Sequence, residues 1–193
     1  MPSLILMTDD VRLADPLPVV LGLPAGAAVI LRHYATADRR RLARRLIAAA
    51  RPKGIRVLIA GDARLALAVG ADGLHLPAAL AARGPGAWTR WRRPGWLVTA
   101  AAHSPAALRR AKRAGADAAL LAPVFRTASH PKARPIGPIR FARWCRESPL
   151  PVYALGGVDG ARAKRLRRAG AVGFAGIGGF LARRRRRPEG LGN

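Results

Sequence analysis

The stretch LRRAKRAGADAALL, residues 108–121, shows the pattern that decides the fold. It runs from the end of an amphipathic helix through a glycine and a small residue into a short aliphatic segment. The same pattern returns as LALAVGADGLHL at 65–76 and as LRRAGAVGFAGI at 166–177. In each copy the glycine falls just past the predicted helix end, where a left-handed backbone costs little for glycine alone. The repeat predicts a helix–turn–strand unit that recurs along the chain.

Short aliphatic segments occur throughout the chain, each bounded by Gly, Pro or a charged residue. Segments this short and this apolar are typical of parallel strands buried on both faces. Between them lie Arg- and Ala-rich segments with apolar residues three or four apart, the spacing of a helix with one buried face. We expect strands at 3–8, 28–33, 57–61, 73–77, 97–103, 118–125, 151–157 and 173–180.

This alternation of strands and helices predicts an α/β fold, and eight such units predict a (βα)8 TIM barrel. A doubly wound sheet is the alternative. The chain has 193 residues, fewer than the roughly 250 typical of this barrel, so we expect short loops and trimmed helices. We expect one compact barrel domain over residues 1–182 and a basic C-terminal tail over 183–193.

The charge balance first suggests a nucleic acid partner, because 35 basic and 10 acidic residues leave a formal net charge of +25. However, 31 of the 35 basic residues are Arg, in a chain dominated by Ala, Arg, Gly and Pro, which is the composition that a GC-rich genome favours. Many of them fall at outward helical positions, as in RRRLARR (39–45) and RRAKRAG (109–115). We therefore expect solvated helix faces, and polyanion binding, with the run at 183–187, is the alternative.

Composition excludes several other classes. Half of the residues are hydrophobic, which argues against intrinsic disorder. The only cysteine, Cys145, excludes an internal disulfide framework and falls in a helical pattern as a packing residue. No apolar run reaches the roughly 18–20 residues that span a bilayer, and the first twelve residues do not resemble a signal peptide. We expect a cytoplasmic protein without a membrane partner.

Two glycine turns follow the last two predicted strands. Gly156 and Gly157 end the strand at 151–157, and Gly176, Ile177 and Gly178 lie within the segment 173–180. TIM barrels commonly bind phosphate at these two positions, because glycine lets backbone N–H groups approach an anion and the next helix adds a positive dipole. The sequence therefore predicts a phosphate site here. The alternative is a pair of tight turns without a ligand.

Other candidate residues lie at predicted strand ends. Arg32 ends an apolar run, which suggests an anion contact or a buried ion pair. His75 and His103 also end strands, where they could transfer protons or only form structural hydrogen bonds. The loop after the sixth strand brings hydroxyl groups and cations toward a phosphorylated substrate, unless it is an ordinary polar surface loop. Its candidates are Thr127, Ser129, His130 and Lys132.

The order and spacing of these segments resemble the thiamine phosphate synthase family, which includes the related thiazole tautomerases. The resemblance is carried by ALAVGADGLHL (66–76), AGADAALLAPVFRTASHPKARPIG (114–137), PVYALGGV (151–158) and AGAVGFAGIGGF (169–180). It implies a (βα)8 barrel that joins hydroxymethylpyrimidine diphosphate to thiazole phosphate and releases pyrophosphate with the help of Mg²⁺. It also implies small phosphorylated heterocycles as partners and allows a homo-oligomer.

The resemblance assigns roles residue by residue. Arg32 matches an arginine that contacts the diphosphate, and Thr127 and Ser129 match hydroxyl residues at the thiazole carboxylate. The two glycine turns, at 156–157 and 177–178, match the cradle of the thiazole phosphate. The family's loop lysine falls on His130, with Lys132 nearby, and both are therefore candidate catalytic residues.

The chain departs from the family where the metal should bind. The family has Asn-Asp at the end of the third strand, and this chain has Ala60-Gly61 with Asp62 one position later. Asp62 is therefore the single candidate Mg²⁺ ligand, because the second expected acid, near Leu80, is missing. The tautomerase histidine falls on Pro123. Three hypotheses follow: a synthase of thiamine biosynthesis, a non-catalytic or regulatory protein that binds a phosphorylated heterocycle, and a polyanion-binding protein on a retired barrel.

Overall fold

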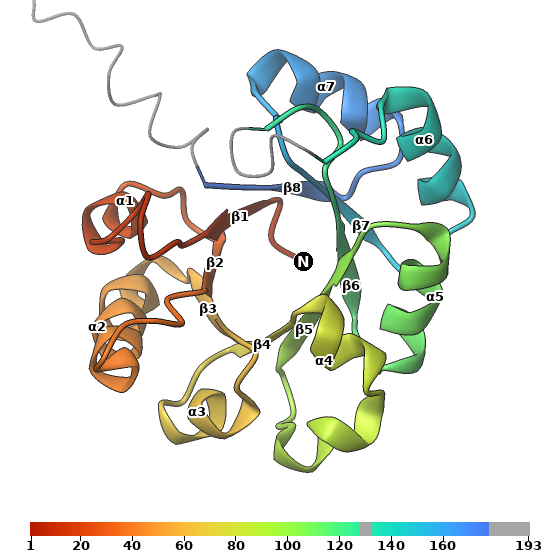
Figure 1. Cartoon of the computed structure of the whole chain (residues 1–193). Coiled ribbons are helices and arrows are strands. Elements are labelled where there is room, and N and C mark those ends of the chain that lie inside the picture. Colours follow the sequence, from red (N-terminus) through yellow and green to blue (C-terminus); the bar gives the residue numbers. More distant parts are fainter. Residues whose placement is uncertain (128–132, 178–193) are drawn as a thin grey trace, which may run out of the picture.

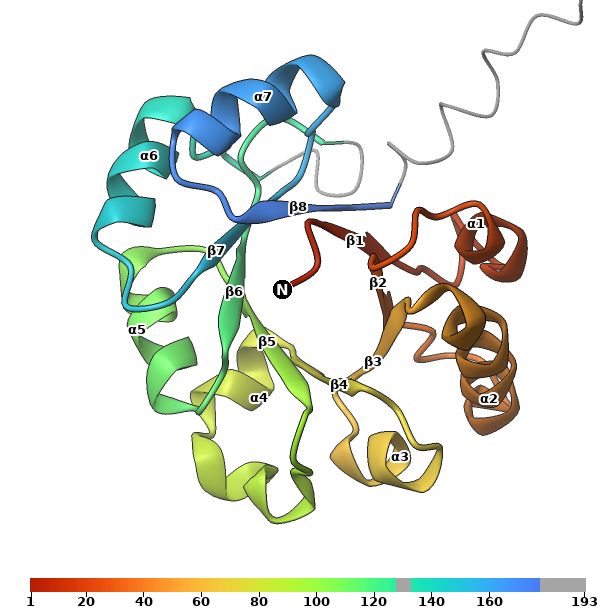
Figure 2. The same cartoon turned by 180° about the vertical axis from the view of Figure 1, so that it is seen from behind.

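A closed barrel of eight parallel strands forms the centre of the molecule in the computed structural model, which describes residues 1–127 and 133–177. Figure 1 looks into the ring of strands, with the helices outside it, and Figure 2 shows the same arrangement from behind. The strands are β1 (Leu4–Met7), β2 (Ala28–Leu31), β3 (Arg56–Ala60), β4 (Gly73–Leu76), β5 (Leu97–Ala102), β6 (Ala118–Leu121), β7 (Val152–Leu155) and β8 (Gly173–Gly176).

Barrel closure confirms the predicted fold and shows that the doubly wound alternative is wrong. Strand β1 pairs in parallel with both β2 and β8, so the described sheet has no free edge. All eight expected strands are present. Most are one to four residues shorter than expected, whereas β3 is shifted by one residue and begins at Arg56 rather than at residue 57. The last of them was expected to reach residue 180, and positions 178–180 lie outside the described residues.

Helices cover the outside of the barrel and are short, as the chain length predicts. They are α1 (Leu17–Leu21), α2 (Arg39–Ala50), α3 (Ala63–Ala68), α4 (Ala78–Ala82), α5 (Pro105–Arg113), α6 (Pro138–Arg146) and α7 (Gly160–Arg168). Single 3-10 turns add η1 (Arg51–Lys53), η2 (Pro85–Ala87) and η3 (Thr89–Trp91). No helix in the described part of the chain is long and apolar enough to cross a membrane.

The repeated helix–glycine–strand unit has the expected local geometry. Gly70, Gly115 and Gly170 follow α3, α5 and α7 with φ angles of 66°, 84° and 98°. These left-handed values are accessible to glycine at little cost and end each helix before the next strand. At the other end of α5, the Ser104 hydroxyl accepts a hydrogen bond from the Ala107 N–H and caps the helix, as its sequence predicts.

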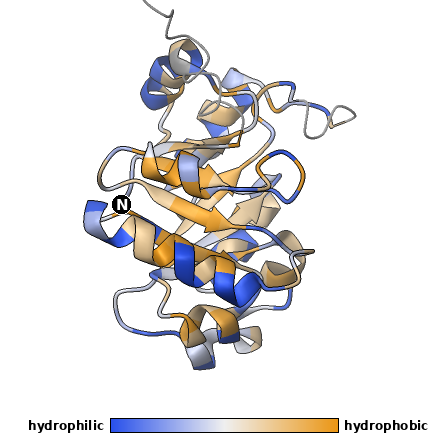
Figure 3. Ribbon diagram, turned by 90° about the vertical axis from the view of Figure 1, so that its left-hand side faces the viewer, coloured by the Kyte–Doolittle hydropathy of each residue, from blue (hydrophilic) through white to orange (hydrophobic). Residues whose placement is uncertain are grey.

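Apolar side chains fill two layers. One cluster lies inside the barrel and includes Ile5, Ile30, Leu58, Leu120 and Tyr153. A larger cluster fills the space between the strands and the helices. Figure 3 shows the hydrophobic strands in the centre and hydrophilic residues on the outer helix surfaces. This division follows from strands buried on both faces and helices buried on one.

The basic residues of α5 follow the prediction, since Arg109, Arg110, Lys112 and Arg113 are exposed. Arg39, the first residue of α2, departs from it because this side chain is partly buried at the ends of β2 and β3. Its position corrects the expectation that 39–45 presents only solvated cations. The expected basic tail at 183–193 lies outside the described residues, and so does the predicted domain boundary at 182.

Candidate functional site

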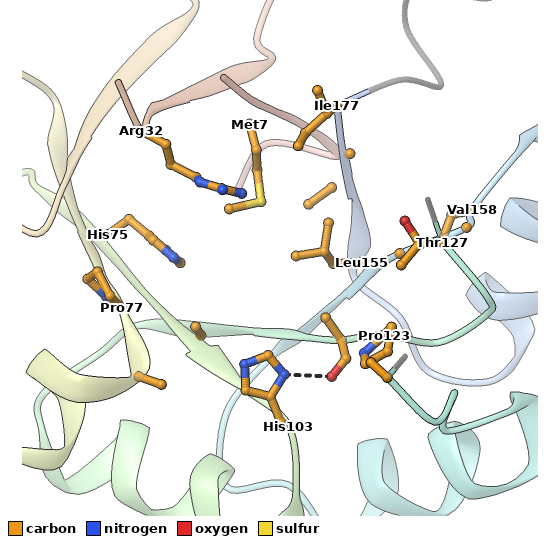
Figure 4. Close-up of a pocket in the computed structure, with 18 of the residues that line it drawn as sticks. Met7, Arg32, His75, Pro77, His103, Pro123, Thr127, Leu155, Val158 and Ile177 are labelled. Atoms are coloured by element: carbon orange, nitrogen blue, oxygen red, sulfur yellow. Dashed lines mark hydrogen bonds between the residues drawn. The ribbon is translucent and has the colours of Figure 1, made fainter. Parts of the chain in front are cut away.

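A cavity of about 850 Å³ opens at the carboxyl ends of the barrel strands. Its wall is built from residues at or after the ends of six strands, β2 and β4 to β8, together with Met7 of β1. In TIM barrels this end carries the chemistry, because the variable loops converge there on a rigid frame. Figure 4 shows Arg32, His75, His103 and Thr127 around the same space. The structure thus brings together four residues that the sequence singled out.

The glycine turn after β7 lies against the loop that follows β6. Gly156 and Gly157 both have left-handed backbones, with φ angles of 93° and 65°. A Cβ atom on Gly157 would lie 2.5 Å from the carbonyl oxygen of Arg126, and one on Gly156 would lie 3.0 Å from Cα of Pro123. Only glycine fits both the conformation and the space.

Arg162 on α7 holds this turn from outside the cavity. Its guanidinium donates a hydrogen bond of 2.8 Å to the carbonyl oxygen of Gly157 and lies over the ring of Phe125, 4.8 Å from the ring centroid. The carbonyl of Gly157 is therefore engaged on the helix side. This contact joins the turn, the start of α7 and the loop after β6 into one unit.

The second predicted turn borders the same cavity. Gly176 is the last residue of β8 and Ile177 follows it, and both line the cavity with Gly156 and Gly157. Strands β7 and β8 are neighbours, so the two turns lie side by side. Gly178, the third residue of the predicted cradle, lies outside the described residues. Phosphate binding by these turns stays a prediction.

Three arginines, Arg12, Arg32 and Arg126, line the cavity, and no acidic residue does so in the described part of the chain. The backbone N–H of Arg32 donates to the Thr8 hydroxyl, which fixes the start of the loop after β2. Its guanidinium lies 3.6 Å from the Asp9 carboxylate, which also forms a 2.9 Å ion pair with Arg12. Hydrogen bonds from Arg12 lower the pKa of Asp9 to about 2, so this acid stays ionised and offsets one of the positive charges.

His75 is neutral in its surroundings. The ring is buried in β4, and its Nδ1 lies 2.9 Å from the hydroxyl of Thr99. Burial lowers the pKa of His75 to about 3, and the charge of Arg32 acts in the same direction. A neutral ring can shape the cavity wall and exchange a hydrogen bond, and it does not supply a positive charge near neutral pH.

His103 has a defined tautomer. It follows β5, and its Nδ1 donates to the carbonyl oxygen of Ala122 over 2.7 Å, since a carbonyl can only accept. The neutral ring therefore carries its lone pair on Nε2, on the side away from Ala122 (Figure 4). His103 is exposed where His75 is buried. Of the two predicted proton-transfer candidates, His103 has the geometry of a base.

The candidate metal ligand does not face the cavity. Asp62 caps α3 by accepting a hydrogen bond of 2.8 Å from the Leu65 N–H, and it is absent from the cavity wall. Within residues 1–127 and 133–177, no three His, Cys, Asp or Glu side chains are grouped closely enough to hold a metal ion. A magnesium ion prefers carboxylates in octahedral geometry. The described residues therefore do not fit the Mg²⁺ site that the resemblance implies.

Sequence reasoning missed Arg12, Tyr34 and Arg126, which also line the cavity. Each lies in a loop that follows a strand. Its position a few residues after a predicted strand end was the only sign in the sequence that it could reach the cavity. Thr127 lines the cavity as expected. Ser129, His130 and Lys132 lie outside the described residues. Cys145 lies on α6, partly buried, and burial raises the pKa of its thiol to about 12, which is consistent with a packing role.

Comparison with known proteins identifies similar chains. The model of a family described as thiamine monophosphate synthase matches residues 9–180. A putative thiamine-phosphate synthase of Geobacter sulfurreducens is 33% identical over 195 residues, covering 93% of this chain and 87% of that protein. The putative thiamine-phosphate synthase 2 of Aquifex aeolicus is 40% identical over 117 residues, covering 61% of each. The chain thus spans less than two thirds of the Aquifex protein, and 29% of a bifunctional ThiM/ThiE protein of Symbiobacterium thermophilum.

A similar fold is present in a solved structure. The thiamine phosphate pyrophosphorylase from Pyrococcus furiosus superposes with a TM-score of 0.74 at 23% identity, covering 91% of this chain and 85% of that one. At this identity the likeness supports the barrel fold alone.

Proposed function

The chain belongs to the thiamine monophosphate synthase family, and from this premise we propose that it serves thiamine biosynthesis by binding a phosphorylated thiazole at the mouth of its barrel. The observation that carries the proposal is the pair of adjacent turns, Gly156-Gly157 and Gly176-Ile177, on one cavity wall. Both follow the strands after which TIM barrels commonly bind phosphate. The backbone N–H groups of such turns can approach phosphate oxygens without interference from side chains.

The rest of the cavity suits the other parts of this ligand. Met7, Leu155 and Ile177 offer apolar surface to a flat heterocycle, while Thr127 adds a hydroxyl group near the glycine turn (Figure 4). The arginines supply positive charge for the anionic groups. Ligand sites commonly combine a mostly apolar wall with a few polar groups that fix orientation.

Isothermal titration calorimetry tests this proposal with a matched pair of ligands, thiazole phosphate and the corresponding thiazole alcohol. We expect the phosphate to bind at least tenfold more tightly, because the alcohol lacks the group that the glycine turns recognise. Equal affinity for the two ligands, or no binding of either, contradicts the proposed phosphate site.

A second candidate function is the joining reaction itself. It is favoured by Arg12, Arg32 and Arg126, which line a cavity large enough for two small ligands. In this reaction the C–O bond of hydroxymethylpyrimidine diphosphate breaks, and pyrophosphate leaves with the bonding electrons. The ring nitrogen of thiazole phosphate then forms a C–N bond to the methylene carbon. Cations near the leaving group stabilise its developing charge.

Pyrophosphate release from the two substrates, measured with and without Mg²⁺, tests the second candidate. We expect release by the natural protein and its loss in the Arg32→Ala variant, because this guanidinium points into the cavity (Figure 4). If the protein binds thiazole phosphate and releases no pyrophosphate, the result supports the binding function and excludes the joining reaction.

A further inference from the structure

Arg39 binds the carboxyl ends of two neighbouring strands. Its Nη2 donates hydrogen bonds to the carbonyl oxygens of Leu31 in β2, at 3.0 Å, and of Ala60 in β3, at 2.7 Å. Its Nε is also buried and has no hydrogen-bond partner among the described residues. A fixed positive charge thus lies at the ends of β2 and β3.

Tyr34 closes the same corner from the cavity side. The guanidinium carbon of Arg39 lies 5.0 Å from the centroid of the Tyr34 ring, within the range of a cation–π contact. The ring also covers Gly61, since a Cβ atom there would lie 3.5 Å from Tyr34 and 3.6 Å from Pro77. An aromatic ring and a proline therefore flank the position that follows β3.

This is the corner where the family pattern places a metal-binding acid. Here the corresponding positions are Ala60, whose carbonyl is already bound by Arg39, and Gly61, which Tyr34 covers. The two acids whose charges act on Arg39 are Asp10 and Asp62. Asp10 accepts hydrogen bonds from the Tyr34 N–H and the Thr36 hydroxyl, and Asp62 caps α3. A guanidinium in this place repels a divalent cation, and the nearby carboxylates already have partners.

We infer that this barrel binds its phosphorylated ligand without a divalent cation, because Arg39 and Tyr34 occupy the corner where a metal would stand. Neutralisation of the anion falls to Arg12, Arg32 and Arg126, which line the cavity. The identity of the ligand in this inference rests on the proposed function. The statement that this corner holds no metal ion can be tested without the ligand. Organic cations can replace a metal in binding an anion because a guanidinium pairs with phosphate oxygens through two hydrogen bonds.

Two measurements on the natural protein test the inference. Electron paramagnetic resonance of Mn²⁺ should show no saturable binding at 1 mM by the protein alone. The affinity for thiazole phosphate should differ by less than about twofold between EDTA and excess Mg²⁺. A saturable Mn²⁺ site, or binding at least tenfold tighter with Mg²⁺, overturns the inference. If thiazole phosphate fails to bind in either buffer, the proposed function fails, and the Mn²⁺ titration still decides the question of the metal.

A charge reversal tests the part assigned to Arg39. Arg39→Glu places a third carboxylate beside Asp10 and Asp62, so we expect at least a tenfold gain in Mn²⁺ affinity. Arg40→Glu is the matched control on the exposed side of the same helix turn and should gain no site. Equal Mn²⁺ affinity in the two variants contradicts the role of Arg39. If circular dichroism shows that Arg39→Glu does not fold, Arg39→Gln serves instead, with the same direction expected.

Discussion

Two histidines of the cavity, His75 and His103, differ because one is enclosed by the barrel and the other is not. His75 is 3% exposed and hydrogen bonded to Thr99, and burial favours its neutral form. His103 is exposed, and its Nδ1–H donates a hydrogen bond to the carbonyl oxygen of Ala122. The same residue type therefore forms a buried, neutral part of the wall at one strand end and an exposed ring after the next strand.

Acid should destabilise the protein through His75. Its pKa is lowered from 6.5 to about 3 in the folded chain, so the unfolded chain binds more protons between these values and stability falls as the pH falls through this window. Between pH 6 and pH 4, the free energy of unfolding of the natural protein should fall with pH more steeply than that of the His75→Asn variant. We expect the two slopes to differ by about 1.4 kcal/mol per pH unit. Urea unfolding at several pH values measures both slopes.

The comparison uses the slopes, so a general loss of stability in the variant does not affect it. Asp9 contributes little in this window, because its lowered pKa of about 2 affects stability mainly below pH 4. Parallel slopes for His75→Asn and the natural protein would show that the His75 pKa is not depressed.

At the scale of elements, the turn between β7 and α7 is held by contacts with the loop after β6 and with the first turn of α7. Gly157 contacts the loop after β6, and Arg162 in the first turn of α7 binds the Gly157 carbonyl. Asp159 caps the same helix by accepting from the Arg162 N–H at 2.9 Å. The position of the proposed phosphate cradle is thus set by three elements that pack together, which is how a preorganised site avoids an ordering cost.

Adding one methyl group to the turn should disrupt the cradle. In Gly157→Ala, the new Cβ meets the Arg126 carbonyl oxygen at 2.5 Å and the left-handed φ is strained. We expect at least tenfold weaker binding of thiazole phosphate by calorimetry and a loss of more than about 2 kcal/mol in the free energy of unfolding.

Gly54→Ala is the matched control for that substitution. Gly54 has a similar φ of 61°, follows η1, and has no atom within 4 Å of an added Cβ. This variant should lose only the about 1–2 kcal/mol of a left-handed L-residue and keep its ligand affinity. Equal affinities in the natural protein and Gly157→Ala would argue against the glycine turn as the phosphate cradle.

Closure organises the whole molecule, since β1 and β8 join residues from opposite ends of the described chain. Tyr153 in β7 contributes to this closure from inside the barrel. Its hydroxyl donates a hydrogen bond of 2.6 Å to the carbonyl oxygen of Pro2, just before β1. Burial of the ring raises the pKa of Tyr153 to about 12, so the hydroxyl keeps its proton across ordinary pH.

Removing this hydroxyl should loosen the start of β1. Tyr153→Phe leaves the ring volume in place and the Pro2 carbonyl without this donor. We expect the free energy of unfolding to fall by about 1–2 kcal/mol, with an unchanged slope in urea. Equilibrium urea unfolding measures both quantities, and an unchanged midpoint would show that the contact does not hold the barrel closed.

Sequence alone was sufficient for the fold because its signals are local. Helix caps such as Ser104, glycines such as Gly115 and short aliphatic runs such as 118–121 act within a few residues, and their repetition leaves little choice of architecture. The glycine turn at 156–157 predicted a phosphate site by itself, and the family resemblance added the thiazole phosphate as its expected ligand. Strand ends were less certain, because the last residue of a run can belong to the strand or to its loop.

Tertiary structure decided what surrounds each candidate residue. The chain gives no local sign that Arg39 bends from an exposed arginine run onto the ends of β2 and β3. Arg12 and Arg126 are far apart in the sequence and meet at one cavity only because the barrel closes. Fold follows from short-range patterns repeated along the chain, whereas charge, burial and proton affinity depend on neighbours that closure brings together.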